Sequence, residues 1–257
     1  DIRKPTFILR RIIRWLSYFI LKHSKSKIFC VGKTAISYFK KRSFSTDRLV
    51  NLPIFVESHE NLDFFASKKD YIFKKINLNH GDFNIVGASR LIFDKGYDIL
   101  LKAFASINEN INKRMKLIIV GNGEEEKALK LEVYNLNIGD RVIFINWMEM
   151  NELKMLIYNA DIFVHPARFD AYGGTTVAMA LKKAVIGSYG AGAAVDRIID
   201  KKNGLLYDPL DYMKLRDLIE KLHVNPILKN SIETEALKTA KSWPPNKGAK
   251  IIINNVI

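Results

Sequence analysis

The sequence predicts an α/β protein built on a doubly wound parallel sheet, preceded by the remnant of a second α/β domain. Six short apolar runs alternate with helical stretches, which is the pattern of strand–helix–strand units. Each run is continuously apolar, as expected for parallel strands covered by helices on both faces. The predicted strands are near residues 83–88, 116–120, 141–145, 161–165, 184–188 and 205–207, and the helices near 96–109, 124–136, 149–158, 173–182, 193–199 and 211–222.

The first part of the chain is predicted to be the end of an incomplete domain, residues 1–56, followed by a linker, residues 57–81. Pro5 opens the first helix, because proline is tolerated in a first turn. The linker is polar and without a clear period, which is typical of connecting segments. The predicted elements are a helix at 5–22, a strand at 27–31, a helix at 33–41, a strand at 48–55 and a short helix at 62–76.

The sheet is predicted to occupy residues 82–225, and residues 226–257 to form a C-terminal helix and tail. A helical stretch runs from Pro226 to Lys241 and is followed by Trp243, two prolines and a last segment at 250–257. The chain begins at Asp1 without a methionine, from which we expect a truncated or processed start.

The composition is that of a globular protein. The chain has 257 residues, of which 48% are hydrophobic and 26% charged, so disordered and fibrous classes are excluded. Cys30 is the single cysteine and lies in an apolar run, which predicts a buried structural thiol and excludes an intramolecular disulfide.

Positive charge is concentrated at the start of the chain. Residues 1–50 carry 13 Lys and Arg against Asp1 and Asp47, which is +11 of the total +14. This basic region fits an anionic membrane surface, nucleic acid or a solvated helix surface. We do not expect a nucleic-acid partner, because stacking platforms and a known nucleic-acid motif are both missing.

The apolar stretch at residues 7–21 is not expected to cross a membrane. Arg10, Arg11 and Arg14 interrupt it, whereas a spanning helix needs about 18 or more apolar residues. It also lacks the cleavage site of a signal peptide. We therefore expect a cytoplasmic protein, with peripheral contact to the inner face of the membrane as an alternative.

The segment from Pro166 to Ala180 suggests a phosphate-binding turn. It follows the predicted strand at 161–165 and contains Asp170, two glycines and a helix start. Gly173, Gly174 and Thr175 would present backbone amides to an anion at the positive end of that helix, a geometry that suits a nucleotide-sugar diphosphate. His165 ends the strand, either as a packed core residue or as part of the site.

A second candidate box follows the strand that begins at Phe83. Arg90 and Lys95 lie there, with Ser89 before and Gly96 after them. This places two cations at the carboxyl end of a strand, where open α/β sheets bind ligands. The alternative is a pair of solvated surface charges.

These two boxes, in this order, resemble the donor-binding domain of retaining glycosyltransferases of family four, which have the GT-B fold. The resemblance covers residues 82–225 and implies a Rossmann-like domain. It also implies that residues 1–56 are the C-terminal part of an N-terminal acceptor domain and that residues 226–257 are a crossover helix and tail. Further matching segments are Lys116–Glu124, Arg141–Trp147, Val185–Ser188 and Asn203–Tyr207.

The resemblance implies roles for individual residues. Arg90 and Lys95 would hold the diphosphate and stabilise the leaving group. Asp170 would be the first carboxylate of a Glu-x7-Glu pair and would hydrogen-bond the transferred sugar. Val177 takes the place of the second carboxylate, which binds ribose, after a one-residue deletion. The base would lie against backbone groups at Gly121, Asn122 and Asn146, and helix-terminal amides would replace a metal ion.

The implied function is transfer of a hexose, with retention, from a UDP- or GDP-hexose to a surface polysaccharide or a lipid-linked acceptor. Two alternatives stay open. The missing second carboxylate and the incomplete acceptor domain favour a catalytically impaired binding or partner subunit. An epimerase of nucleotide sugars shares the architecture, but it would need a further acid/base pair.

Overall fold

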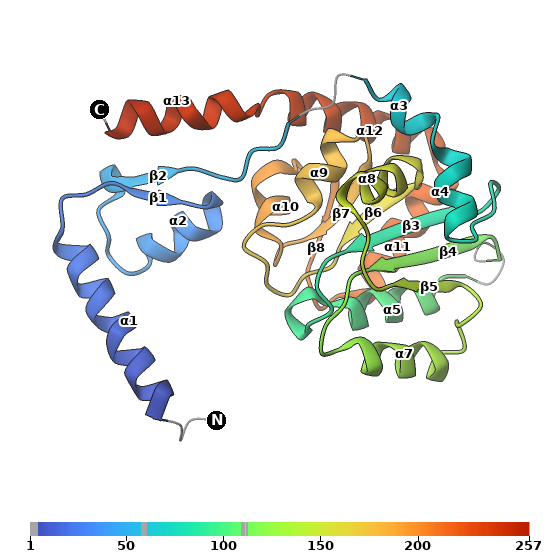
Figure 1. The fold of residues 1–257 in the computed structure, drawn as a ribbon, viewed down its shortest axis with the longest axis horizontal. Helices are drawn as coiled ribbons and strands as arrows, with labels where there is room; N and C mark the ends of the chain where they lie inside the picture. Colours follow the sequence, from blue (N-terminus) through green and yellow to red (C-terminus); the bar gives the residue numbers. More distant parts are fainter. Residues whose placement is uncertain (1–4, 58–60, 109–110, 112, 257) are drawn as a thin grey trace.

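The computed structural model describes residues 5–57, 61–108, 111 and 113–256. Part of the predicted linker and the end of the helix predicted at 96–109 lie outside these residues. The main sheet has six parallel strands in the order β5-β4-β3-β6-β7-β8 (Figure 1). Its strands are β3 (Phe83–Ala88), β4 (Met115–Val120), β5 (Val142–Ile145), β6 (Ile162–His165), β7 (Ala184–Ser188) and β8 (Leu205–Tyr207).

This strand order confirms the predicted doubly wound fold. The chain runs outward from β3 through β4 to β5, then returns to β6 on the other side of β3 and runs outward through β7 to β8. The direction of winding therefore reverses between β3 and β6. At such a switch point the loops leave the strands in opposite directions and open a crevice at the carboxyl edge, where ligands bind.

Helices cover both faces of the sheet, and each face has its own apolar cluster. One cluster joins the sheet to α5, α7 and α11, and the other joins it to α8, α9 and α10 (Figure 1). This explains why every strand is continuously apolar. The helices are α5 (Tyr97–Ala105), α7 (Glu126–Asn135), α8 (Met150–Asn159), α9 (Thr175–Ala180), α10 (Gly192–Arg197) and α11 (Tyr212–Val224).

A small unit precedes the main sheet. It consists of α1 (Pro5–His23), β1 (Ile28–Cys30), α2 (Gly32–Lys40) and β2 (Leu49–Asn51), in which β1 and β2 pair in parallel. Cys30 is buried in its core, as predicted, and burial raises the pKa of the thiol. The predicted strand at 48–55 is too long: β2 is in register with β1 as far as Asn51, and the Leu52 amide makes the last bond to it, at the Cys30 carbonyl.

The small unit meets the main sheet domain through α2 and α10. The Lys33 amide, in the first turn of α2, donates a 2.7 Å hydrogen bond to Asp196 Oδ1. Gly32 lies in the left-handed region at φ +84°, and a side chain there would collide with the same carboxylate. Asp196 itself belongs to α10, so a carboxylate of one helix caps another helix 163 positions away.

The predicted linker helix at 62–76 is two helices, α3 (Asp63–Ala66) and α4 (Lys69–Lys75), which both pack near α8.

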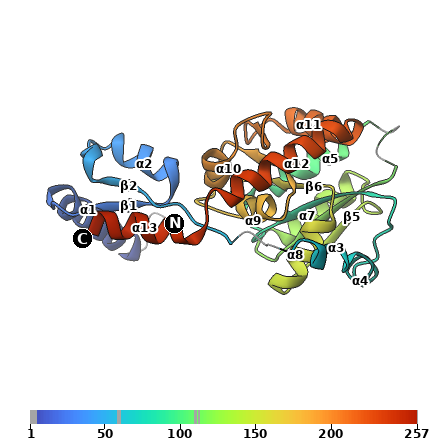
Figure 2. The same cartoon turned by 90° about the horizontal axis from the view of Figure 1, so that it is seen from above.

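Two helices end the chain. The first, α12 (Pro226–Lys241), packs on α9 and β7, and Asn225 caps it by accepting from the Leu228 amide. The predicted tail is a helix, α13 (Pro245–Val256), which extends back toward β2 of the small unit (Figures 1 and 2). Within the described chain, no helix has both the length and the apolar character needed to traverse a bilayer.

Candidate functional site

The loops that follow β3 and β6 pack directly on each other at the switch point. Gly96 has φ +67°, and a side chain at this position would collide with the Pro166 carbonyl. The Phe169 amide donates to the Asp94 carbonyl at 3.0 Å. The two boxes predicted from the sequence therefore form one continuous surface at the carboxyl edge of the sheet.

Four polar side chains meet there, and we refer to Asp170, Lys95, His165 and Thr175 as the Asp170 cluster. Lys95 Nζ lies 2.7 Å from Asp170 Oδ2, and His165 Nε2 lies 3.0 Å from the same oxygen. His165 Nδ1 lies 2.9 Å from Thr175 Oγ1. The side chains of Lys95 and Asp170 are each only 10% exposed, so this is a largely desolvated network.

Asp170 is held as a carboxylate. Burial alone raises its pKa, but the hydrogen bonds from His165 and Lys95 outweigh burial, and the net pKa lies below its usual value. Both contacts go to Oδ2, and Oδ1 has no hydrogen-bond partner among the residues that the structure describes. The cluster thus presents a fixed carboxylate with one oxygen available to a ligand.

The glycines of the turn are needed for packing against the protein's own side chains. A Cβ on Gly173 would lie 2.6 Å from His165 Cε1 and 2.8 Å from Asp170 Oδ2, and one on Gly174 would lie 2.6 Å from Phe163 Cζ. Gly174 directly precedes α9, whose first residue, Thr175, is fully buried. The sequence predicted glycine here for close approach to an anion, and packing is a further reason for it.

The two predicted cations have different surroundings. Arg90 is exposed, and within the described part of the chain its guanidinium has no hydrogen bond or ion pair. Lys95, by contrast, is buried against Asp170. Arg168 was missed by the sequence reasoning: it pairs with both carboxylate oxygens of Asp98 at 2.7 and 2.5 Å and stacks on Phe93. Its role is to fasten the loop after β6 onto α5.

The loop after β4 borders the same edge. Gly121 has φ +140°, and a side chain there would collide with the Ser89 carbonyl. The Leu91 amide donates to the Asn122 carbonyl at 2.8 Å, so this loop is tied to the Arg90 box. The side chains of Asn122 and Asn146 are exposed, and Asn146 directly follows β5.

Val177 is partly buried and packs against the apolar cluster that includes α9. Residues 171–194 contain no Asp or Glu, so the site has no second carboxylate in the turn or in α9. Among the residues that the structure describes, no group of three His, Cys, Asp or Glu side chains is arranged to hold a metal ion.

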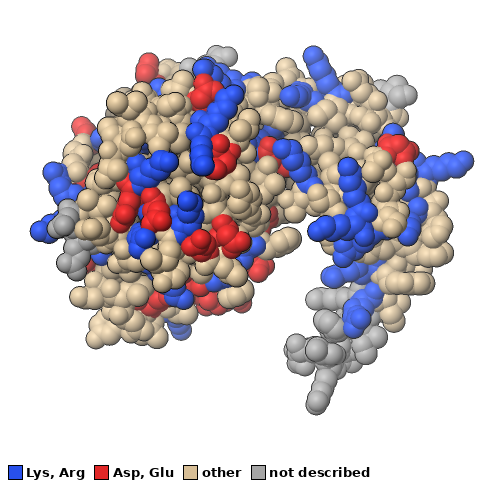
Figure 3. Space-filling view, turned by 180° about the vertical axis from the view of Figure 1, so that it is seen from behind, with Lys and Arg blue, Asp and Glu red and all other residues tan. Residues whose placement is uncertain are grey.

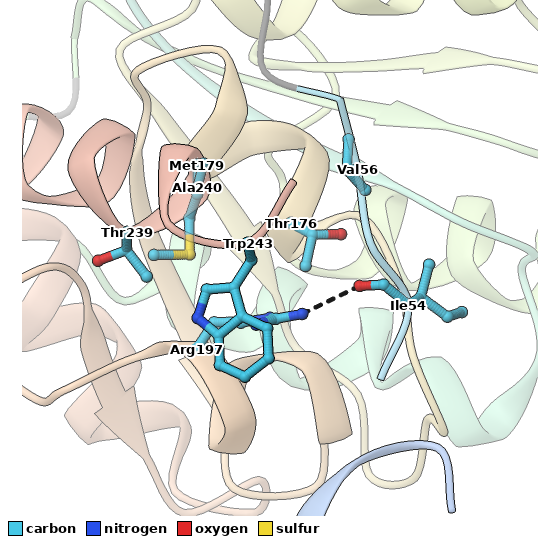
Figure 4. A pocket seen from close by; sticks show the side chains of 8 residues that line it. All are labelled: Ile54, Val56, Thr176, Met179, Arg197, Thr239, Ala240 and Trp243. Atoms are coloured by element: carbon cyan, nitrogen blue, oxygen red, sulfur yellow. Dashed lines mark hydrogen bonds between the residues drawn. The ribbon is translucent and has the colours of Figure 1, made fainter. Parts of the chain in front are cut away.

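Arg197 lies between the segment around Ile54 and Trp243, near the C-terminal end of the chain (Figure 4), and also contacts the turn before α9. Its Nε donates to Tyr172 Oη at 2.9 Å, its Nη2 donates to the Ile54 carbonyl at 3.1 Å, and its guanidinium stacks on Trp243 at 3.8 Å. Burial raises the pKa of Tyr172 to about 12. The adjoining cavity of about 10 Å³ has room for about one water molecule, so it is not a ligand site.

The model of the family described as glycosyl transferases group 1 matches residues 68–239. The chain belongs to this family. The matched region contains the whole six-stranded sheet and the Asp170 cluster.

Curated relatives match over part of their length. The chain is 27% identical over 133 residues to alpha-monoglucosyldiacylglycerol synthase of Streptococcus pneumoniae, covering 52% of this chain and 30% of that protein. It is 24% identical over 236 residues to the capsular polysaccharide biosynthesis glycosyltransferase CapM of Staphylococcus aureus, covering 86% of this chain and 60% of CapM. The chain thus spans less than two thirds of either glycosyltransferase.

The GT-B fold is shown by solved structures. HepE of Anabaena, solved in complex with UDP, superposes with a TM-score of 0.83 at 18% identity, covering 99% of this chain and 69% of HepE. At this identity the match establishes the architecture, including the small unit and α13.

Proposed function

We propose that this chain is the donor-binding part of a retaining glycosyltransferase that transfers a hexose from UDP- or GDP-hexose to a surface-polysaccharide or lipid-linked acceptor. The observation that carries the proposal is the Asp170 cluster at the switch point, with the exposed Arg90 on the same loop as Lys95. Relatives named for capsular polysaccharide and for a glycolipid, and a UDP complex of the same fold, support it.

The proposed roles follow from charge and position. Arg90 and the amides of Gly173, Gly174 and Thr175 bind the donor diphosphate, and Lys95 adds a second cation behind them. Fixed positive charge at this point stabilises the departing nucleoside diphosphate without a metal ion. Asp170 accepts hydrogen bonds from the hexose and favours positive character at its reacting carbon. Gly121, Asn122 and Asn146 border the base, and Val177 lies near the ribose.

The chain spans only part of its relatives' length, and we propose that it divides into four parts. Residues 1–56 belong to an acceptor domain, 57–81 to a linker, 82–225 to the donor domain and 226–257 to a crossover helix and tail. We place the protein in the cytoplasm.

A catalytically impaired binding or partner subunit is the second candidate function. Residues 171–194 contain no Asp or Glu, which favours it. Val177 stands where the second carboxylate would bind the ribose, and no carboxylate of this segment takes over that contact. Two missing charge-assisted hydrogen bonds would each reduce donor affinity roughly ten- to a hundredfold. Sugar transfer by the full-length protein, measured with radiolabelled donor, distinguishes the two candidates.

The chain is expected to bind a nucleoside diphosphate without metal. Calorimetric titration with UDP and GDP in EDTA should give the same affinity as without the chelator. Arg90→Ala should weaken binding by about tenfold or more, the effect of one charge-assisted contact. Arg114→Ala is the matched control, because Arg114 is an exposed arginine before β4, at the amino edge of the sheet. Loss of all binding on chelation would contradict the metal-free site.

The small unit is also proposed to contact an anionic membrane surface. Six exposed apolar side chains recur every three or four residues along α1 and form one stripe: Leu9, Ile12, Ile13, Leu16, Phe19 and Ile20. Tyr18 and Leu21, on the opposite side of the helix, pack against the small unit's core. Lys and Arg gather over the small unit with few acidic side chains among them (Figure 3). Such a helix lies in a lipid interface with its apolar face down.

Trp15→Glu is expected to weaken binding to vesicles that contain anionic lipid. Trp15 is 66% exposed and stacks on Phe19, so the substitution puts a negative charge beside the stripe. Tyr134→Glu is the matched control, because Tyr134 is 80% exposed but lies on α7 of the main domain. Co-sedimentation at low and high salt measures the effect, since each basic residue near the surface contributes about 1 kcal/mol. Equal loss in both variants, or binding that salt does not change, would contradict the proposal.

A further inference from the structure

His165 is buried, and both of its ring nitrogens have partners. It ends β6 with 4% of its surface exposed. Nε2 faces Asp170 Oδ2 at 3.0 Å and Nδ1 faces Thr175 Oγ1 at 2.9 Å. The ring thus connects the Asp170 carboxylate to Thr175, the first residue of α9.

The chemistry of the partners determines where the ring proton lies. A carboxylate only accepts hydrogen bonds, and Asp170 is held ionised, so Nε2 must carry the proton. In a neutral imidazole Nδ1 is then an acceptor, and the hydroxyl of Thr175 can donate to it. A ring with a proton on Nε2 and an Nδ1 that accepts from Thr175 satisfies all three groups at once.

The surroundings leave the Asp170 side chain little freedom. Lys95 and His165 both contact Oδ2, and Gly173 packs so closely that a Cβ would meet the His165 ring and Asp170 together. Lys95 lies on the loop after β3, whereas His165 belongs to the rigid sheet itself. Oδ1 has no partner within the described residues, so it is the oxygen available to a ligand.

We propose that His165 is a positioning residue, which holds the Asp170 carboxylate so that Oδ1 accepts from a hydroxyl of the transferred hexose. Thr175 fixes the tautomer that makes this possible. The inference rests on the proposed function, in which Asp170 contacts the hexose. It predicts that His165 matters for the sugar of the donor and not for its nucleotide.

The test compares the affinities of the intact chain for UDP-glucose and UDP, and for GDP-mannose and GDP. His165→Leu should weaken binding of the preferred nucleotide sugar about tenfold, the effect of losing a charge-assisted hydrogen bond, and change that of the bare nucleotide less than about twofold. His165→Gln keeps an N–H donor near the Nε2 position and should recover most of the difference. Thr175→Val removes only the hydroxyl and should give a smaller loss in the same direction.

Nitrogen-15 NMR of the unmodified chain tests the tautomer without any substitution. The expected spectrum at pH 7 has a protonated Nε2 and an unprotonated Nδ1. The positioning role would be overturned if folded His165→Leu lost equal affinity for the nucleotide sugar and the bare nucleotide. A proton on Nδ1 alone would also overturn it. If the unmodified chain binds none of the four ligands, the proposed function fails, and the inference fails with it.

Discussion

Lys95→Ala is expected to destabilise the fold by about 3–5 kcal/mol, the usual cost of removing one partner of a buried ion pair. Lys95 Nζ lies 2.7 Å from Asp170 Oδ2, and both side chains are 10% exposed, so screening by solvent is weak. The same change should weaken binding of UDP or GDP, because it removes a cation next to the proposed diphosphate site. Urea unfolding at pH 7 and calorimetry with the nucleotide measure the two effects.

The difference in unfolding free energy between the unmodified chain and Lys95→Ala should depend on pH. Asp170 has a lowered pKa in the folded state, so it contributes stability above its unfolded pKa of about 3.9, and this contribution is lost as pH falls through the folded pKa. The gap between the unmodified chain and Lys95→Ala should therefore be largest near pH 7 and should narrow below about pH 4.

Lys102→Ala is the control for Lys95→Ala, because Lys102 is a half-exposed lysine of α5 that lies 3.8 Å from Glu132. It should change stability by less than about 1 kcal/mol. If both variants lose the same small amount at pH 7, the Asp170 cluster is not a desolvated network.

Arg197→Leu is expected to cost about 2–4 kcal/mol of unfolding free energy. Arg197 is buried, and the substitution leaves Tyr172 Oη and the Ile54 carbonyl without their partner and removes a stack on Trp243 at 3.8 Å. Two charge-assisted hydrogen bonds and a desolvated cation–π contact account for this magnitude. Thermal and urea unfolding measure it.

Arg42→Leu is matched to Arg197→Leu, since Arg42 also lies over an aromatic ring, Tyr38, at 3.5 Å but is exposed. It should cost about 1 kcal/mol or less. A loss of that size in Arg197→Leu would show that the buried contacts are no stronger than exposed ones. A shift in the emission of Trp243 should accompany unfolding of this junction.

The strands of the main sheet could be predicted from the sequence because burial on both faces leaves a continuous apolar run. β3, β7 and β8 have the predicted bounds, β4 is one residue longer, and β5 and β6 are each one residue shorter. β2 was predicted too long, because the chain after Leu52 has left β1 and has no strand to pair with. Periodicity describes the burial of a segment, but pairing depends on its neighbours in space.

The candidate site could be located for a similar reason, since loops at the carboxyl ends of neighbouring parallel strands must converge. Asp170 and Lys95 were both identified, yet their ion pair was not, nor was the pairing of Arg168 with Asp98. Contacts between residues about 70 positions apart leave no periodic signal in one sequence. His165 ends a predicted strand and lies five positions before Asp170. This short distance along the chain was the one indication in the sequence that His165 belongs to the Asp170 cluster.

The polypeptide passes twice between the small unit and the main domain, once after β2 and once between α12 and α13, and the two passages touch where Phe55 and Trp243 lie 5.9 Å apart. One tether would allow the small unit to tumble in any direction. Two tethers side by side, together with the contact between α2 and α10, restrict that movement. Arg197 contacts both passages, at Ile54 and at Trp243, and also holds Tyr172, so the turn before α9 is tied to the point where the small unit joins the main domain.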